Sequence, residues 1–287
     1  MKYLVLGANS YIGSYIYDNL KKEGYSVVGT AHLGNNTELY PYNIECDDIC
    51  SLPINWQTDS KVAIICIAIT NLNMYVDNYD LAYLICVTRM KKLVDSLVRQ
   101  GFFVVYFSSD NVYDGCRGMY KEDDEPNPIS LYGKLKAEME KWLLEKYANI
   151  CILRLAKAVC HRKHKRNLFD EWDRCQQNGK TIYCIKNNIL SFVALEDIYR
   201  ACVIVANKRL GGLYNISGDM AFSRKQLADI FFKTAGKMCD IVECSYKELG
   251  FRDARPLNVS MSNAKFKCLT GYEFTRMEKV MQSYIRE

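Results

Sequence analysis

The sequence contains no apolar stretch long enough to cross a membrane as a helix. Its longest purely apolar run is Val62–Ile69, eight residues, whereas a helical span needs about 20. The opening segment Met1–Gly7 is too short for the apolar core of a secretory signal, and Asn9 and Ser10 end it. We therefore expect no membrane association, and a cytoplasmic location is the simplest interpretation.

The cysteines lack the features of a disulfide framework. There are 13 of them, an odd number, scattered from Cys46 to Cys268 without a repeating spacing. Disulfide-stabilised domains are usually shorter and denser in cysteine. Neither Cys46 with Cys50 nor Cys239 with Cys244 has the spacing of a zinc site or a histidine pair nearby. We expect reduced thiols without a structural metal.

Neither sign of charge dominates the chain. Lys and Arg number 38 against 33 Asp and Glu, a net charge of +5, with 49% hydrophobic and 25% charged residues. These are values of an ordinary globular protein, and so small a surplus gives no reason to expect nucleic-acid binding. One dense basic stretch, His161–Arg166, is either a solvated loop or a contact for a substrate phosphate. Its two histidines could ligate a metal, but the flanking Lys and Arg repel a cation, so we expect no metal.

Short apolar runs alternate with helical periodicities through the first half of the chain. The expected strands are Lys2–Leu6, Tyr25–Gly29, Val62–Ile69, Phe102–Phe107 and Ile150–Leu155, and the expected helices are Ile12–Gly24, Asp77–Gln100 and Ser130–Tyr147. This alternation is typical of βαβ units. It predicts an α/β fold with a doubly wound parallel sheet of the Rossmann type over residues 1–155. We expect residues 156–287 to form mainly a smaller C-terminal substrate-binding lobe, with some segments returning to the main domain.

Two local predictions accompany this fold. The helix over residues 77–100 should turn its periodic apolar residues inward, namely Leu81, Leu84, Ile85, Leu93, Val94 and Leu97. Ser223 followed three residues later by Gln226 predicts a capping box at the start of a helix that runs to Ala235.

A glycine-containing turn follows the first expected strand. The segment Gly7–Gly13 reads Gly-Ala-Asn-Ser-Tyr-Ile-Gly and leads into the first helix. Such a turn brings the N–H groups and the positive dipole end of a helix against a pyrophosphate. In this chain Ser10 takes the middle position, where it adds a side chain. The position of the segment, after a strand and before a helix, predicts a dinucleotide site.

The end of the second expected strand carries no carboxylate. The region reads Val28-Gly29-Thr30-Ala31-His32, and an acid at this place would bind the ribose diol of NAD. Its absence favours NADP, with Thr30 and His32 as neighbours of the 2′-phosphate. NAD remains an alternative, because no arginine is present there either.

Tyr132 and Lys136 stand four residues apart at the start of an expected helix, so they share a face. The ammonium favours the phenolate and lowers the tyrosine pKa from about 10 towards working pH. Such a tyrosine can exchange the proton of a carbonyl/alcohol pair while a nicotinamide exchanges hydride. The pair Tyr17 and Lys21 has the same spacing, but it lies on the first helix, past the turn. Ser109 follows a strand, at the sheet edge where ligands bind, and can hydrogen-bond a substrate oxygen.

With these residues in place, the sequence resembles the extended short-chain dehydrogenase/reductases, and within them the dTDP-4-dehydrorhamnose reductases. The matching segments run through nearly the whole chain: Ser108–Gly115, Glu125–Pro128, Tyr132–Lys136, Ile152–Arg154, Phe192–Asp197, Gly212–Gly218 and Ala254–Asn258. The chain departs from the family at five positions, with Ser10 for a glycine, Ser109 for a threonine, Cys86 for an asparagine, Asn43 for an aspartate and Asn111 for a tyrosine.

The resemblance implies a role for each candidate residue. Ser109 would polarise a sugar carbonyl, Tyr132 would protonate its oxygen, and Lys136 would hold the nicotinamide ribose and lower the tyrosine pKa. It also implies cofactor contacts from the turn residues Gly7, Asn9, Ser10, Tyr11, Ile12 and Gly13, from Asn43 and Ile44 near the adenine, and from Ile67, Ala68 and Ile69 under the ribose. Asp110 and Asn111 would contact the substrate beside Ser109. Independently of the resemblance, Arg255 either pairs with the substrate diphosphate, because a planar donor suits phosphate, or is a surface arginine flanking a helix.

The expected function is therefore NAD(P)H-dependent reduction of a nucleotide-linked 4-keto-6-deoxy sugar, in the biosynthesis of nucleotide sugars or polysaccharides, by a chain that could form a homodimer. One alternative is a nucleotide-sugar epimerase or dehydratase on the same scaffold. Dehydratases tend to carry a second acid where this chain has Asn111. The other is a non-catalytic NADP-binding regulatory subunit, similar to that of methionine adenosyltransferase. The nucleotide, the sugar and the product stereochemistry stay open.

Overall fold

A parallel sheet forms the centre of the N-terminal part of the chain. The structure, a computed structural model, describes residues 1–32, 37–54, 56, 60–164 and 166–287. The strands of this sheet are β1 (Lys2–Leu6), β2 (Ser26–Ala31), β3 (Tyr40–Pro41), β4 (Lys61–Ile65), β5 (Phe102–Ser109), β6 (Ile150–Leu155) and β10 (Gly212–Ile216). Within the described residues their order is β10-β6-β5-β4-β1-β2-β3. The predicted doubly wound Rossmann-type sheet is confirmed.

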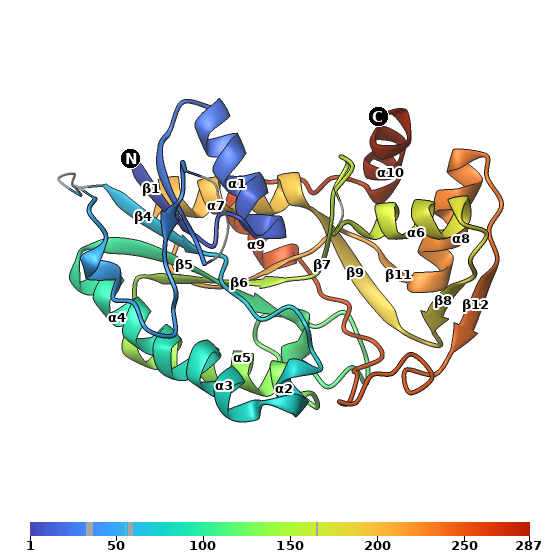
Figure 1. The fold of residues 1–287 in the computed structure, drawn as a ribbon, viewed down its shortest axis with the longest axis horizontal. Coiled ribbons are helices and arrows are strands. Elements are labelled where there is room, and N and C mark those ends of the chain that lie inside the picture. Colours follow the sequence, from blue (N-terminus) through green and yellow to red (C-terminus); the bar gives the residue numbers. More distant parts are fainter. Residues whose placement is uncertain (33–36, 55, 57–59, 165) are drawn as a thin grey trace. The chain divides into compact units, whose positions relative to one another are not determined.

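Helices cover both faces of this sheet. They are α1 (Tyr11–Lys22), α2 (Met74–Asp77), α3 (Tyr79–Tyr83), α4 (Met90–Arg99), α5 (Leu131–Lys146) and α7 (Leu195–Lys208). Figure 1 shows α1 and α7 on one face and α3, α4 and α5 on the other. Every residue of β5 is buried, which explains why Phe102–Phe107 is a continuous apolar run and does not alternate. None of the described helices combines the length and apolarity that a membrane span requires.

The helix expected over residues 77–100 is interrupted. Between α3 and α4 the residues Leu84–Arg89 form a π-helical turn, which adds a residue to the turn and rotates the following side chains. Leu93, Val94 and Leu97 are buried as expected, but Leu84 is 39% exposed. The expectation that Leu84 faces inward was wrong, because a constant period of 3.6 residues does not hold across this turn.

The third expected strand is also shorter than its apolar run. β4 ends at Ile65, which pairs with Leu6 at the end of β1. The five residues of β1 limit the ladder, so Cys66–Ile69 leave the sheet as a loop at its carboxyl edge.

The chain divides into two units, each assembled from three segments. The first unit comprises Met1–Ser108, Leu135–Leu153 and Tyr199–Leu213, and the second comprises Ser109–Lys134, Arg154–Ile198 and Tyr214–Glu287. Further elements of the second unit are β7 (Lys157–Val159), β8 (Ile182–Ile185), β9 (Ile189–Ala194), β11 (Ala221–Ser223), β12 (Ile241–Cys244), α6 (Leu168–Gln177), α8 (Arg224–Ala235), α9 (Ala264–Thr270) and α10 (Met277–Arg286).

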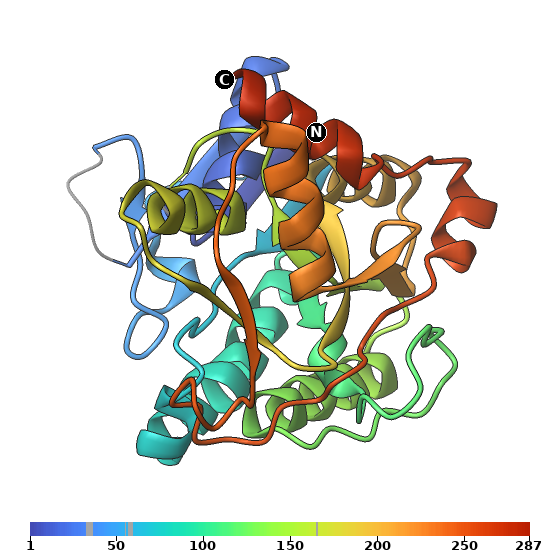
Figure 2. The same cartoon turned by 90° about the vertical axis from the view of Figure 1, so that its right-hand side faces the viewer.

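An aromatic cluster forms the core of the second unit. Phe169 stacks on Phe231 at 5.2 Å, and Trp172 and Tyr284 pack against the same rings. These side chains come from α6, α8 and α10, and Figure 2 shows α8 and α10 lying side by side. The predicted capping box at Ser223 is present at the start of α8.

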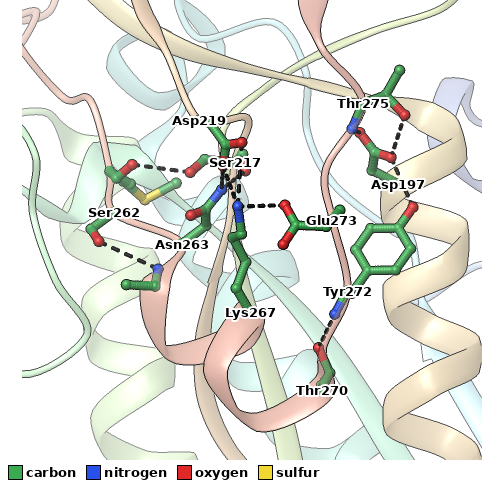
Figure 3. Close-up of polar contacts among 12 residues, drawn as sticks. Asp197, Ser217, Asp219, Ser262, Asn263, Lys267, Thr270, Tyr272, Glu273 and Thr275 are labelled. Carbon is green, nitrogen blue, oxygen red and sulfur yellow. Dashed lines mark hydrogen bonds and ion pairs between the residues drawn. The ribbon is translucent and has the colours of Figure 1, made fainter.

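Two acidic residues, Asp197 and Asp219, form hydrogen bonds with the segment from Asn263 to Thr275, which precedes α10 (Figure 3). Asp197, at the start of α7, accepts hydrogen bonds from the Tyr272 hydroxyl at 2.8 Å and from the N–H and hydroxyl of Thr275 at 3.1 and 2.8 Å. Asp219 accepts from Asn263 Nδ2 at 2.8 Å and from Lys267 Nζ at 3.2 Å. Asp197 therefore joins parts of the second unit that are distant in sequence.

Candidate active site

The glycine turn brings the first helix close to the end of β1. Gly7 has φ +81°, and a Cβ there would lie 3.2 Å from the backbone carbonyl of Cys66. A Cβ on Gly13 would lie 2.2 Å from the Gly7 oxygen. The Ser10 hydroxyl turns back and accepts the Gly13 N–H at 3.0 Å, which caps α1. The turn thus keeps a cradle at the helix N-terminus that fits the pyrophosphate of a dinucleotide. Asn9 is exposed beside it, while Tyr11 and Ile12 are half-buried.

Thr30 supports this turn and does not face a ligand. Its hydroxyl accepts the Gly7 N–H at 3.2 Å, and its carbonyl accepts the Ala8 N–H at 2.7 Å. The side chain is only 1% exposed, so a 2′-phosphate could not reach it. Of the two residues considered for that phosphate, His32 is the exposed one.

Asn43 and Ile44 lie in a turn fixed by neighbouring polar groups. The Asn43 N–H donates to Asp47 Oδ2 at 2.6 Å. Ile44 is buried, and its carbonyl accepts from Arg89 Nε at 2.7 Å. Arg89 belongs to the π-helical turn, so that irregular turn orients the residues expected near the adenine.

Ile67, Ala68 and Ile69 follow Cys66, the first residue after β4, beside the glycine turn. The Ile67 nitrogen lies 3.3 Å from the position of a Cβ on Gly7. The Ile69 carbonyl accepts from Tyr75 Oη at 3.2 Å, and Ala68 is exposed. The loop is therefore held at the carboxyl edge of the sheet, where the sequence predicts a ribose contact.

Lys136 is a buried ammonium in the first unit. Its Nζ donates to the Phe107 carbonyl at 2.7 Å and to Tyr106 Oη at 3.1 Å. Burial lowers the pKa of Lys136 to about 8, although Cys86 and Glu140 act in the opposite direction. Cys86 lies in the π-helical turn and is itself buried. A lysine with such a pKa exchanges its proton near neutral pH, which suits a role in acid–base chemistry.

Ser109, the last residue of β5, belongs to a closely bonded turn in the second unit. Its hydroxyl accepts from the N–H and Nδ2 of Asn111 at 3.2 and 3.3 Å, and it donates to Asp110 Oδ1 at 2.9 Å. Asn111 Nδ2 also donates to Asp110 Oδ1 at 2.8 Å. Burial raises the pKa of Asp110, while these hydrogen bonds and the charge of Lys157 act to lower it.

Tyr132 lies in the first turn of the helix α5, close to the loop formed by Ser109, Asp110 and Asn111. A Cβ on the next residue, Gly133, would lie 2.0 Å from the Asn111 carbonyl oxygen. The close approach therefore requires glycine at position 133, and it brings the helix start carrying Tyr132 against Asn111. Because α5 is one continuous helix, Lys136 follows Tyr132 by one turn on the same face.

Arg255 is a half-buried cation with unused hydrogen-bond donors. Among the described residues, none accepts a hydrogen bond from its buried Nε or Nη2. The guanidinium lies over the Phe251 ring at 4.2 Å, and burial lowers the pKa of Arg255. Asp253, two residues earlier, accepts the Leu131 N–H at 2.7 Å at the start of α5. Buried donors without acceptors are costly, so the site fits an anion such as a diphosphate.

Two residues that sequence reasoning did not single out help to build this site. Lys157 on β7 is the cation whose charge favours ionised Asp110. Gly115 lets the loop after Ser109 pack on the segment next to Arg255, since a Cβ there would lie 2.6 Å from the Leu257 nitrogen. Lys157 had no distinguishing signal in the sequence, whereas Gly115 was part of the family motif.

The remaining candidates are the basic stretch His161–Arg166 and the cysteines. In the basic stretch, His164 Nδ1 accepts the Arg166 N–H and His161 Nε2 accepts from Arg162 Nε, both at 3.2 Å. Lys165 lies outside the described residues. Elsewhere in the described chain no group of three His, Cys, Asp or Glu could hold a metal. All 13 cysteines are free thiols.

The family model of the RmlD substrate binding domain matches residues 1–287. The chain belongs to this family. The names of the related proteins describe different functions. Subunit beta of methionine adenosyltransferase 2 from Bos taurus is 25% identical over 242 residues, covering 78% of this chain and 69% of the relative.

Two further relatives cover nearly the whole chain. A Haloferax volcanii protein named "Probable low-salt glycan biosynthesis reductase Agl14" is 24% identical over 277 residues, or 92% of each chain. The solved structure of dTDP-4-dehydrorhamnose reductase from Bacillus anthracis, in complex with NADP, superposes with a TM-score of 0.84 at 21% identity, covering 99% of this chain and 98% of that one. RmlD-type chains thus share this fold.

Proposed function

We propose that this chain reduces the keto group of a nucleotide-linked sugar with NADPH. One observation carries the proposal: Lys136 is a buried ammonium bonded to β5, and Tyr132, one turn before it on α5, begins a helix that contacts the Ser109 turn through Gly133. A phenol can give a proton to a carbonyl oxygen, with an ammonium to stabilise its charge and a serine hydroxyl to bind that oxygen.

Each side chain would have one task in the reaction. A bound nicotinamide dinucleotide supplies hydride to the carbonyl carbon. Tyr132 gives its proton to the carbonyl oxygen, and the Lys136 charge stabilises the resulting phenolate. Ser109 hydrogen-bonds the same oxygen, and Arg255 binds the substrate diphosphate through its unused donors.

The residues present fit a dinucleotide. The cradle formed by Gly7 and Gly13 would hold the pyrophosphate, and the loop Ile67–Ile69 would lie along the ribose. NADP is favoured over NAD because the end of β2 offers the exposed His32 and no carboxylate. The substrate proposed is a 4-keto-6-deoxy sugar nucleotide, the class to which dTDP-4-dehydrorhamnose belongs. A homodimer stays a prediction.

Replacing Tyr132 with Phe tests the proposal. We expect purified protein to oxidise NADPH in the presence of dTDP-4-dehydrorhamnose or a related keto sugar nucleotide. Tyr132→Phe should lower kcat by about 10²- to 10⁴-fold, because the proton donor is lost, with little change in KM or NADPH binding. Tyr17→Phe is the matched control, since Tyr17 and Lys21 share the spacing but lie on α1; it should keep the wild-type kcat.

The alternatives give different results in the same assay. If NADPH binds but no keto sugar nucleotide is reduced, the reductase proposal fails. A binding subunit is then favoured, as the likeness to subunit beta of methionine adenosyltransferase 2 suggests, and co-purification with the catalytic subunit of that enzyme would be the next measurement. An epimerase would convert a sugar nucleotide without net NADPH oxidation.

A further inference from the structure

The hydroxyl of Ser109 has all its hydrogen-bonding positions occupied. A serine hydroxyl offers one donor and two acceptor positions. The N–H and Nδ2 of Asn111 fill the two acceptor positions at 3.2 and 3.3 Å, and the O–H is donated to Asp110 Oδ1 at 2.9 Å. In this arrangement Ser109 has no proton left for the oxygen of a substrate carbonyl.

The amide of Asn111 is what completes this arrangement. Its Nδ2 bridges the Ser109 hydroxyl and Asp110 Oδ1. The reductases that this chain resembles carry a tyrosine here. The only side-chain donor of a tyrosine is at the far end of its ring, so it cannot form so short a bridge. Saturation of the Ser109 hydroxyl is thus a property of this chain's own residue.

Asp110 controls where the Ser109 proton points. Asp110 as a residue is 6% exposed, and its carboxyl group interacts with Ser109, Asn111 and the charge of Lys157. An ionised carboxylate can only accept hydrogen bonds, so it retains the Ser109 proton. A protonated carboxyl group is a weaker acceptor and carries an O–H of its own, so it releases that proton to another acceptor.

We propose that Asp110 and Asn111 are positioning residues: Asp110 holds the Ser109 proton, Asn111 bridges the two groups, and Ser109 activates the substrate carbonyl only when Asp110 is protonated. A proton from solvent binds the Asp110 carboxylate. The hydrogen bond from Ser109 to Asp110 Oδ1 breaks, and one to the carbonyl oxygen forms; no covalent bond of Ser109 changes. This inference rests on the proposed reductase function.

The pH profile of kcat tests it. Burial raises the pKa of Asp110, so wild-type kcat should fall as pH rises through that pKa, by up to about tenfold per pH unit because a single proton is lost. Asp110→Asn should lack this step, since an amide does not titrate, and should keep any decline due to Tyr132 and Lys136. Asn111→Tyr removes the Nδ2 bridge that keeps the Ser109 hydroxyl beside Asp110 Oδ1, so it should weaken the step.

Asp197→Asn is the matched control, because it removes another buried carboxylate of the second unit that contacts none of the candidate residues. It should retain the wild-type pH profile at temperatures where it is folded. If Asp110→Asn and wild type have the same profile, the inference is overturned while the reductase function stands.

A second measurement does not depend on turnover. A carboxyl group whose folded pKa is raised contributes stability that is full at low pH and is lost as pH rises through the folded pKa. The Tm of wild type should therefore fall relative to that of Asp110→Asn across this window. If no keto sugar nucleotide is reduced at any pH, the proposed function fails, and parallel Tm curves would then show that Asp110 does not titrate in this window, which removes the proton switch as well.

Discussion

Asp197 and Asp110 are both buried carboxylates of the second unit, and burial raises the pKa of both. Their partners differ. Asp197 is bonded by Tyr272 and Thr275, 75 and 78 positions away, whereas Asp110 is bonded by its immediate neighbours in the chain. A carboxylate with distant partners joins parts of the fold. One with adjacent partners adds little to the fold, so the cost of burying it is better explained by chemistry.

Asp197→Ala should give the largest loss of stability. It leaves the Tyr272 hydroxyl and both Thr275 donors without their acceptor, and each unsatisfied group costs about 1–3 kcal/mol. We expect the free energy of unfolding in urea to fall by about 3–4 kcal/mol, and by about 1 kcal/mol or less for Asp110→Ala. Asp229→Ala, which removes an exposed helical ion pair, serves as control. Equal losses at Asp197 and Asp110 would remove the distinction between them.

Lys136 extends the comparison to a buried cation. Its pKa is about 8 in the folded protein and about 10.4 when unfolded. Between these values the unfolded state binds more protons, so stability should rise with pH. The gain is about 3 kcal/mol across the window. Lys136→Met should lack that rise, measured by urea unfolding at pH 7.5 to 10 (roughly the titration window). A constant difference between the two proteins would show that Lys136 does not titrate there.

Tyr272→Phe should have a smaller effect than Asp197→Ala. It removes one of the donors to Asp197 and keeps the ring, so we expect a loss of about 1–2 kcal/mol, typical of a hydrogen bond to a charged group. In the Asp197→Ala background the same substitution should cost almost nothing, because its partner is already gone. Additive losses would mean that the Tyr272 hydroxyl stabilises the fold by another contact.

Much of the fold could be predicted because local signals agree with it. β1 and β6 have the bounds expected from their apolar runs, and the capping box at Ser223 is where its spacing placed it. The exposed Leu84 and the early end of β4 could not be predicted in the same way. A π-helical turn leaves no periodic pattern, and the length of β4 is set by its partner β1 and not by its own residues.

The sequence suggested which residues belong to the candidate site, but not how they are bonded. Tyr132 and Lys136 stood out by their spacing and Ser109 by its place at the end of a strand, and their joint role stays a prediction. It suggested Thr30 as a phosphate neighbour, although its hydroxyl is used by the Gly7 N–H. Likewise, nothing in the sequence indicates that the Asn111 amide bonds back to Ser109. Whether a polar side chain faces a ligand or the backbone depends on donors that only the folded turn supplies.

The division into two units, each of three segments, has a consequence for the gene. The second unit contains Ser109–Lys134 from the middle of the chain as well as Tyr214–Glu287 from its end. No single crossover can therefore exchange one unit between related genes and leave the other intact. Variation in the second unit therefore arises more readily by point substitutions than by exchange of a contiguous module.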